Sequence, residues 1–251
     1  MQIVGYEAGT PDEAAALRLA TDGTVTTHRL LPGERLDFGL GQRHCAGRID
    51  DTSHEPCENS KAPYCDVHTI RWPCAQCRGD CAMPIEACHE EHAIYLAAFE
   101  PDQFKVGVTR QWRLQTRLTE QGARRAAHIR TVDNGRRARQ IEAEIANDVP
   151  DRITTDTKIS GLGQPLDLDA WEQFLGPYGV IEMFDFDYGL ELEVQPIPTT
   201  MATGRIHGSS GRILVLEEGE TTYAIDLRAL IGYEISDGGS DPDRQTSLGA
   251  F

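Results

Sequence analysis

The first 43 residues alternate short apolar runs with turn-forming residues, a pattern typical of β-strands. The apolar runs are Ile3-Val4, Leu17 to Leu19, Val25 and Leu36 to Phe38, and they are separated by Gly9, Asp22-Gly23 and Pro32-Gly33. We therefore predict an N-terminal β segment over residues 1–43.

Residues 93–148 combine strand and helix periodicities. The predicted elements are strands over 93–99 and 104–108, a helix over 112–121, a strand over 128–132 and a helix from 135 to about 146. Pro101-Asp102 marks the turn of a hairpin, and Gly122 is placed to end the first helix. The expected order is therefore strand, strand, helix, strand, helix.

The C-terminal part returns to a β pattern. Residues 149–175 form a connector in which Trp171, Phe174 and Leu175 indicate a docked helix, and residues 176–238 predict a β domain. Glu217-Glu218-Gly219-Glu220 reads as the turn of a hairpin. The polar tail over 239–251 is expected to be disordered. We predict an α+β fold whose two terminal β segments pair in one barrel-like structure.

Residues 44–92 lack apolar periodicity and contain all seven cysteines. Such a segment cannot build a hydrophobic core of its own and needs a cross-link, such as a disulfide or a bound metal ion, to hold its structure. The chain shows no apolar run of about 20 residues and no signal-peptide pattern, so we expect a cytoplasmic protein without membrane contacts. In a reducing compartment, an odd number of cysteines indicates metal ligands rather than disulfides.

The spacing of these residues predicts two structural zinc sites in a module over 44–92. The eight candidate ligands are Cys45, Cys57, Cys65, His68, Cys74, Cys77, Cys81 and Cys88. A sequential partition gives the first four to one tetrahedral site and the last four to another. In a cross-braced partition, Cys45 and Cys57 would share one zinc site with Cys74 and Cys77. Further candidates for the histidine position are His44, His54, His89 and His92.

The charge distribution is uneven. The chain carries a net charge of −16, yet residues 105–139 contain ten basic side chains and two acidic ones, which leaves −24 on the rest. We call residues 105–139 the positive island. In an acidic protein, such a cluster of positive charge suggests a site that binds the phosphate backbone of nucleic acid, or else arginines that pair with the protein's own acidic residues. The abundance of acids and the presence of only three lysines also suggest a salt-rich cell.

Two segments of the hairpin resemble the motifs of GIY-YIG nucleases. Ala93-Ile94-Tyr95 stands at the place of the first motif and Lys105-Val106-Gly107 at the place of the second. The expected order of elements is also that of the GIY-YIG core. Together with Glu120 to Ala123, the upstream cysteines and the C-terminal glycines, these segments identify the chain as a member of domain-of-unknown-function family 2797.

The resemblance to GIY-YIG nucleases implies phosphodiester hydrolysis with one divalent metal. Tyr95 would help to activate water, Arg113 or Arg117 would stabilise the phosphate, and Glu142 would hold Mg²⁺ or Mn²⁺. Lys105 replaces the tyrosine of the second motif, and no late asparagine matches the family pattern.

Three hypotheses follow, and none of them fixes the oligomeric state. The first is a zinc-containing protein that binds DNA or RNA, for example on the ribosome. Its contacts would be Lys105, Arg110, Arg113, Arg117, Arg124 and Arg125. Trp72 or Trp112 could stack on bases, although the helical spacing favours Trp112 in the core. The second hypothesis is a metal-dependent endonuclease, and the third is an interaction scaffold whose arginines pair internally.

Overall fold

The computed structural model describes residues 1–69, 79 and 88–238. The chain divides into two compact units, one formed by Met1–Ile70 with Pro196–Phe251 and the other by Arg71–Gln195. The first unit therefore contains both ends of the chain. Three of the predicted zinc ligands, Cys74, Cys77 and Cys81, as well as Trp72 and the tail over 239–251, lie outside the described residues.

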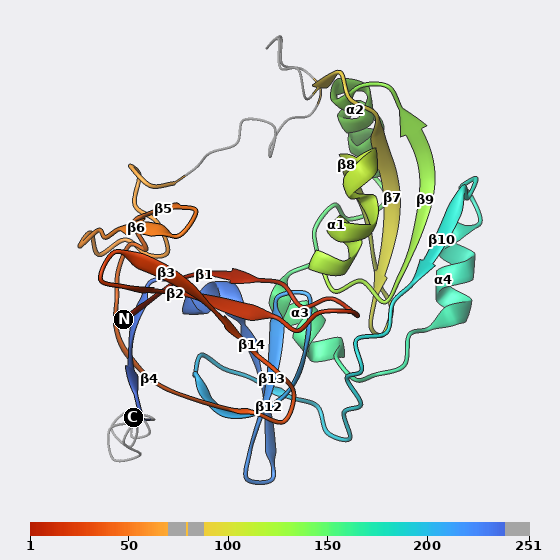
Figure 1. The fold of residues 1–251 in the computed structure, drawn as a ribbon. Coiled ribbons are helices and arrows are strands. Elements are labelled where there is room, and N and C mark those ends of the chain that lie inside the picture. Colours follow the sequence, from red (N-terminus) through yellow and green to blue (C-terminus); the bar gives the residue numbers. More distant parts are fainter. Residues whose placement is uncertain (70–78, 80–87, 239–251) are drawn as a thin grey trace, which may run out of the picture. The chain divides into compact units, whose positions relative to one another are not determined.

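The first unit is built on a mixed sheet with the strand order β11-β14-β13-β12-β4-β15-β1-β2-β3-β6-β5 (Figure 1). Its strands are β1 (Gln2–Glu7), β2 (Ala16–Thr21), β3 (Thr24–Arg29), β4 (Arg35–Arg43), β5 (Arg48–Asp50), β6 (Ser53–Glu55), β11 (Ile197–Pro198), β12 (Thr203–Ser210), β13 (Ile213–Glu218), β14 (Thr221–Asp226) and β15 (Tyr233–Asp237). A 3₁₀ turn, η4 (Leu227–Leu230), precedes β15. The two terminal segments thus pair with each other, as the sequence suggests.

This sheet is open, and the expected barrel is not present in the described part of the chain. Its edges are β5, of three residues, and β11, of two, which do not pair with each other. Strands this short offer few hydrogen bonds with which to close a barrel. The core of the unit comes from alternating positions of the longer strands and includes Ile3, Leu17, Leu36 and Leu214. The predicted hairpin is confirmed, because β13 and β14 pair in antiparallel register around the Gly219 turn.

The second unit contains a four-stranded antiparallel sheet with the order β10-β9-β7-β8 (Figure 1). Its elements are β7 (His92–Phe99), β8 (Gln103–Arg110), the 3₁₀ turn η3 (Gln111–Arg113), α1 (Leu114–Glu120), β9 (Arg125–Val132), α2 (Gly135–Ile145), α3 (Thr155–Gly161), α4 (Leu168–Leu175) and β10 (Glu182–Asp185). The predicted order of two strands, a helix, a strand and a helix is therefore present.

Each face of this sheet packs against different helices. Tyr95, Ala97 and Phe99 of β7 point to the face covered by Leu114 and Leu118 of α1. The alternate β7 residues, Ile94, Leu96 and Ala98, point to the opposite face, where Ala138 and Ile141 of α2 and Trp171 of α4 pack. Because side chains alternate along a strand, α1 and α2 lie on opposite faces of the sheet.

Local sequence signals explain where the helices of this unit begin and end. Asn134 accepts a hydrogen bond from the Arg137 N–H and so caps the start of α2, and Asp167 caps α4 through the Ala170 N–H. Gly122 has a positive φ of 70°, as expected for a glycine that ends a helix. Two elements differ from the sequence prediction: α3 forms within the connector, and β10, predicted with the C-terminal β domain, pairs with β9 instead.

No helix in the described parts of the chain is both long enough and apolar enough to cross a membrane.

Candidate functional site

Four potential metal ligands come together in the first unit. Cys45 follows β4, Cys57 follows β6, and Cys65 and His68 lie on the next turn. Their ligand atoms all lie within 4.8 Å of one another. The Nδ1 atom of His68 is 3.4 Å from the Sγ of Cys45 and 3.3 Å from the Sγ of Cys65. We call these four residues the metal cluster.

The metal cluster fits a tetrahedral zinc ion. With usual zinc bond lengths, the sulfur–nitrogen edge of the tetrahedron is about 3.5 Å, close to the two distances observed. Three thiols and an imidazole are soft or borderline ligands, which suit zinc and not magnesium or calcium. The cluster can therefore hold one metal ion such as zinc, with residues drawn from a single unit.

Backbone N–H groups donate hydrogen bonds to the sulfur atoms of the metal cluster. The Sγ atom of Cys45 accepts hydrogen bonds from the N–H of Gly47 at 3.4 Å and of Cys65 at 3.3 Å. Burial raises the pKa of Cys45 in spite of these bonds. Burial also opposes ionisation of Cys65, but hydrogen bonds from the N–H groups of His68 and Val67, together with those of the Cys45 and His68 side chains, outweigh it and lower the Cys65 pKa to about 6. A thiolate is the form that a metal binds.

The other histidines do not join this cluster. His44 Nδ1 lies 2.8 Å from the Cys57 carbonyl oxygen, and His54 Nε2 lies 2.8 Å from that of Ala46. His89 is exposed, and His92 bonds the Glu90 carbonyl in the second unit. The four residues brought together are the first set of the sequential partition. Of the second set only Cys88 lies in the described part of the chain, where it is buried.

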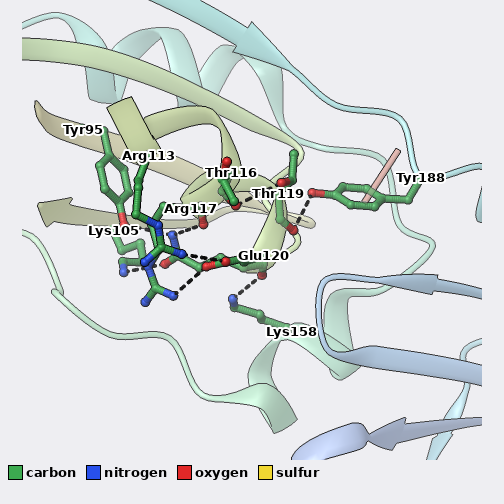
Figure 2. Close-up of polar contacts among 10 residues, drawn as sticks. Tyr95, Lys105, Arg113, Thr116, Arg117, Thr119, Glu120, Lys158 and Tyr188 are labelled. Carbon is green, nitrogen blue, oxygen red and sulfur yellow. Dashed lines mark hydrogen bonds and ion pairs between the residues drawn. The ribbon is translucent and has the colours of Figure 1, made fainter. Parts of the chain in front are cut away.

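A second site gathers basic side chains around Tyr95 in the second unit (Figure 2). Its members are Tyr95 of β7, Lys105 of β8, Arg113 of η3, Arg117 of α1, Gln121 directly after α1, and Lys158 of α3. We call these residues the Tyr95 site. Gln121 lies at its centre: Lys105 Nζ donates to Gln121 Oε1 at 3.0 Å, and Lys158 Nζ donates to the Gln121 carbonyl oxygen at 2.7 Å.

The Gln121 side chain also connects to the aromatic member of the site. Its Nε2 atom donates to Tyr95 Oη and to the Arg117 carbonyl oxygen, both at 2.9 Å. Tyr188 holds the turn that carries Gln121, because its hydroxyl lies 3.2 Å from the carbonyl oxygens of Thr119 and Ala123. Burial raises the pKa of Tyr188, so this hydroxyl stays protonated as a donor. The turn after α1 is thereby fixed beside Tyr95 (Figure 2).

Trp112 lies on the surface, which corrects its expected place in the core. Its side chain is 69% exposed, since Leu114 and Leu118 supply the buried face of α1 and Trp112 precedes them on η3. The guanidinium groups of Arg110 and Arg113 each lie 5.9 Å from the Trp112 ring centroid. The indole N–H donates to Glu90 at 3.1 Å. We call Arg110, Trp112, Arg113 and Arg117 the Trp112 surface.

The arginines of the positive island divide into paired and exposed groups. Arg110 pairs with Glu90 at 3.5 Å. The carboxylate of Glu120 forms ion pairs with Arg113 at 2.8 Å and with Arg117 at 3.6 Å. Arg124 pairs with Glu100 and Asp187, and Arg125 pairs with Asp185. Arg130 and Arg137 are exposed. Internal ion pairs therefore account for part of the island, as the scaffold hypothesis predicts, but not for its exposed part.

Glu142 does not meet Tyr95. It lies on α2 next to Ile141, on the opposite face of the sheet, and its carboxylate pairs with Arg139 at 2.6 Å. Within residues 1–69, 79 and 88–238, the metal cluster is the only group of three or more potential ligands. The structure therefore shows no Mg²⁺ or Mn²⁺ site at Glu142.

Comparison with protein families identifies the chain. The family model described as "Protein of unknown function (DUF2797)" matches residues 33–235. The chain belongs to the DUF2797 family. Comparisons with curated proteins and with solved structures found no match. DUF2797 membership covers the metal cluster and the Tyr95 site alike, while the family description assigns no activity to either.

Sequence reasoning missed two members of the Tyr95 site in this DUF2797 protein, Gln121 and Lys158. A compositional signal was available for Lys158, because the chain has only three lysines and two of them lie in the second unit. Gln121 lies in the Glu120 to Ala123 segment that carries the family resemblance, but nothing in that segment assigns it a role, which comes from its position after α1.

Proposed function

We propose that this DUF2797 protein binds single-stranded nucleic acid through the Trp112 surface. The observation that carries the proposal is the exposure of Trp112, which is 69% accessible. The guanidinium groups of Arg110 and Arg113 each lie 5.9 Å from the centroid of its ring. An exposed aromatic ring offers a stacking platform for a base, and arginines beside it can bind the flanking phosphates. A base stacked on an aromatic side chain contributes about 1–3 kcal/mol.

The net charge of the chain argues that this contact is local. A protein with a charge of −16 gains little from long-range attraction to nucleic acid. Direct arginine–phosphate hydrogen bonds remain effective, because they depend on contact geometry as well as on charge. The Trp112 surface concentrates three arginines within eight residues, from Arg110 to Arg117.

The metal cluster supports a structural zinc ion in this proposal. Its four ligands fill a tetrahedral site, so no position is left for a substrate. We propose that zinc binds here and staples the loop after β4 to the loop after β6. A second zinc ion held by Cys74, Cys77, Cys81 and Cys88 remains a prediction.

The alternative is a GIY-YIG-type endonuclease. Tyr95, Lys105, Arg113 and Arg117 lie together, which favours contact with a phosphate. Hydrolysis by the implied mechanism also needs a carboxylate for Mg²⁺ or Mn²⁺ on the same face, whereas Glu142 lies on the other face. Binding is therefore the better supported of the two functions.

Fluorescence anisotropy with labelled single-stranded RNA and DNA tests the proposal. Replacing Arg110, Arg113 and Arg117 by Gln should weaken binding and reduce the slope of log K against log salt by about 2, since each phosphate contact contributes about 0.7. Trp112→Ala should weaken binding with little change in the slope. A matched control replaces three exposed arginines of the first unit, Arg29, Arg48 and Arg205, by Gln. Equal losses in the control and in the test variant would refute the assigned surface.

A further inference from the structure

The two edges of the four-stranded sheet differ in what lies beside them. At the β8 edge, the Val106 N–H donates to the Pro150 carbonyl oxygen at 3.0 Å, so the connector between α2 and α3 pairs with this strand. At the β10 edge, no backbone of the described residues pairs with the outer side of the strand (Figure 1). An uncovered edge strand is a template for pairing with another chain.

The register of β10 on β9 shows which backbone groups face outward. The Phe186 N–H donates to the Arg124 carbonyl oxygen at 2.9 Å, in the same register as the ladder before it. Alternate residues of an antiparallel strand direct their N–H and C=O groups to opposite sides, so Met183 and Asp185 direct theirs away from β9. Within the part of the chain that the structure describes, these groups have no hydrogen-bond partner. They are therefore available to a further strand.

The side chains along this edge are apolar and exposed. Val180 is 42% exposed, Ile181 61% and Met183 42%. Met183 points to the sheet face packed against α2 and α4, whereas Glu182 points to the α1 face. Neither lysine nor proline, which protect many edge strands from pairing, occurs in β10. The edge thus offers apolar contacts on one face and a carboxylate on the other.

The charge around this edge has one sign. Residues 159–195, which belong to the second unit, contain eight acidic residues and no lysine or arginine. Asp185 pairs with Arg125, whereas the exposed Glu182 has no ion pair within the described residues. A second copy of β10 would place acidic side chains against acidic ones, and like charges on adjacent strands are destabilising. The edge therefore suits a basic segment better than another copy of this chain.

We propose that the β10 edge binds an extended basic segment of another protein, which adds a strand to the sheet. Backbone hydrogen bonds to Met183 and Asp185 hold this segment, and its side chains provide the specificity. Because side chains alternate along a strand, an apolar residue lies beside Met183 and a basic residue beside Glu182. The inference is independent of nucleic-acid binding, since the Trp112 surface begins at the end of β8, the opposite edge of the sheet.

Short synthetic peptides test the proposal on the full chain. One peptide alternates valine with arginine, a second alternates valine with glutamate, and a third is the arginine peptide with N-methyl groups on alternate backbone nitrogens. The arginine peptide should bind at least about fivefold more tightly than the glutamate peptide, as expected for one exchanged cross-strand charge pair. N-methylation should remove binding when it blocks the nitrogens that face β10. Hydrogen exchange should show that the bound arginine peptide protects the Met183 and Asp185 amides.

Two substitutions at Met183 separate its backbone from its side chain. Met183→Pro removes an N–H that faces outward, a replacement that edge strands tolerate, and should weaken the arginine peptide at least about fivefold. Met183→Thr is the matched control, because it changes the side chain but keeps the N–H, and it should retain most of the affinity. Glu182→Lys should reverse the preference between the two charged peptides. Glu220→Lys makes the same charge change at an exposed turn of the first unit and should leave the preference unchanged.

Each outcome supports or overturns the proposal. Equal binding of the arginine and glutamate peptides overturns the basic partner. Full binding of peptides methylated on either set of alternate nitrogens overturns strand addition, and this result needs no variant, so it decides the matter even if Met183→Pro fails to fold. A wild-type dimer that Met183→Pro dissociates, measured by sedimentation, assigns the edge to a second copy and overturns the proposed partner.

Discussion

The ring of Tyr95 lies directly over Gly107, its partner in the register of β7 and β8. A Cβ atom at Gly107 would be 2.5 Å from both Cζ and Oη of Tyr95 and 2.9 Å from Cε2. Real Cβ atoms do not approach neighbours so closely, so only glycine fits beneath this ring. The glycine of the second motif is therefore explained by the tyrosine of the first.

Gly107→Ala should displace the Tyr95 ring and lower the free energy of unfolding by about 1–3 kcal/mol, the usual cost of overpacking. Urea denaturation measures this. Gly5→Ala is a matched control on β1, because a Cβ there meets Arg18 at an ordinary 3.6 Å. A Gly107→Ala variant as stable as the control would mean that the ring moves without cost. Tyr95→Phe should not rescue the variant, since ring carbons take part in the clash.

Loss of either Cys57 or His68 should remove one zinc ion per chain. Cys57→Ser and His68→Asn each leave three ligands, and a structural zinc site contributes directly to folding. Metal analysis of purified protein should show about one zinc fewer in both variants, together with a lower melting temperature. His28→Asn is the control for zinc content, because His28 lies on β3, outside the metal cluster and outside the cysteine-rich segment. Unchanged zinc content in Cys57→Ser would contradict the assigned ligand set.

Local patterns predict much of this molecule because they depend on few residues. The strand, strand, helix, strand, helix order follows from apolar periodicity, and Gly122 marks the end of α1 as expected. Both features depend on neighbours along the chain. Ligand chemistry also marks the four residues of the metal cluster as candidates, but spacing leaves the sequential and cross-braced partitions open, and only the folded chain brings the first set together.

Features that depend on distant partners could not be predicted in this way. The pairing of β10 with β9 joins Glu182 to His128 across about fifty residues, and nothing within Glu182–Asp185 specifies this partner. Trp112 was misplaced because helical spacing treats η3 and α1 as one helix, while the buried face begins at Leu114. The Tyr95 site required the meeting of β8, α1 and α3, which only the folded chain shows.

Glu100 should make the stability of the second unit depend on pH. Burial raises its pKa above the ordinary 4.5, although the Gly163 N–H and Arg124 oppose this. A carboxyl with a higher pKa in the folded state binds more protons when folded, so its contribution to stability falls as the pH rises from 4.5 through the folded value. The stability of wild type relative to Glu100→Gln should therefore decline across this window, as measured by urea denaturation at several pH values.

The contribution of Glu218 to stability should depend on pH in the direction opposite to that of Glu100. A hydrogen bond from Arg35 lowers the pKa of Glu218, so its contribution is present above 4.5 and is lost as the pH falls through the folded value. Wild type relative to Glu218→Gln should therefore gain stability as the pH rises. The effect will be small, because the pair is exposed. Trends of the same sign for both residues would contradict the role of burial at Glu100.

Glu120 competes with phosphate for two arginines of the Trp112 surface. Its carboxylate binds Arg113 at 2.8 Å and Arg117 at 3.6 Å, in the way that a phosphate would. Glu120→Gln removes this negative charge and releases both guanidinium groups. Because exposed ion pairs contribute up to about 1 kcal/mol, affinity for single-stranded nucleic acid should rise by about fivefold.

Glu142→Gln is the matched control for this charge change. It also removes a carboxylate paired with an arginine, Arg139, but on the opposite face of the sheet. Anisotropy titrations at one salt concentration should show tighter binding for Glu120→Gln and no change for Glu142→Gln. If both variants bind more tightly by the same factor, the gain reflects the net charge of the chain. If only Glu120→Gln gains, the two arginines that it releases lie where the phosphates bind.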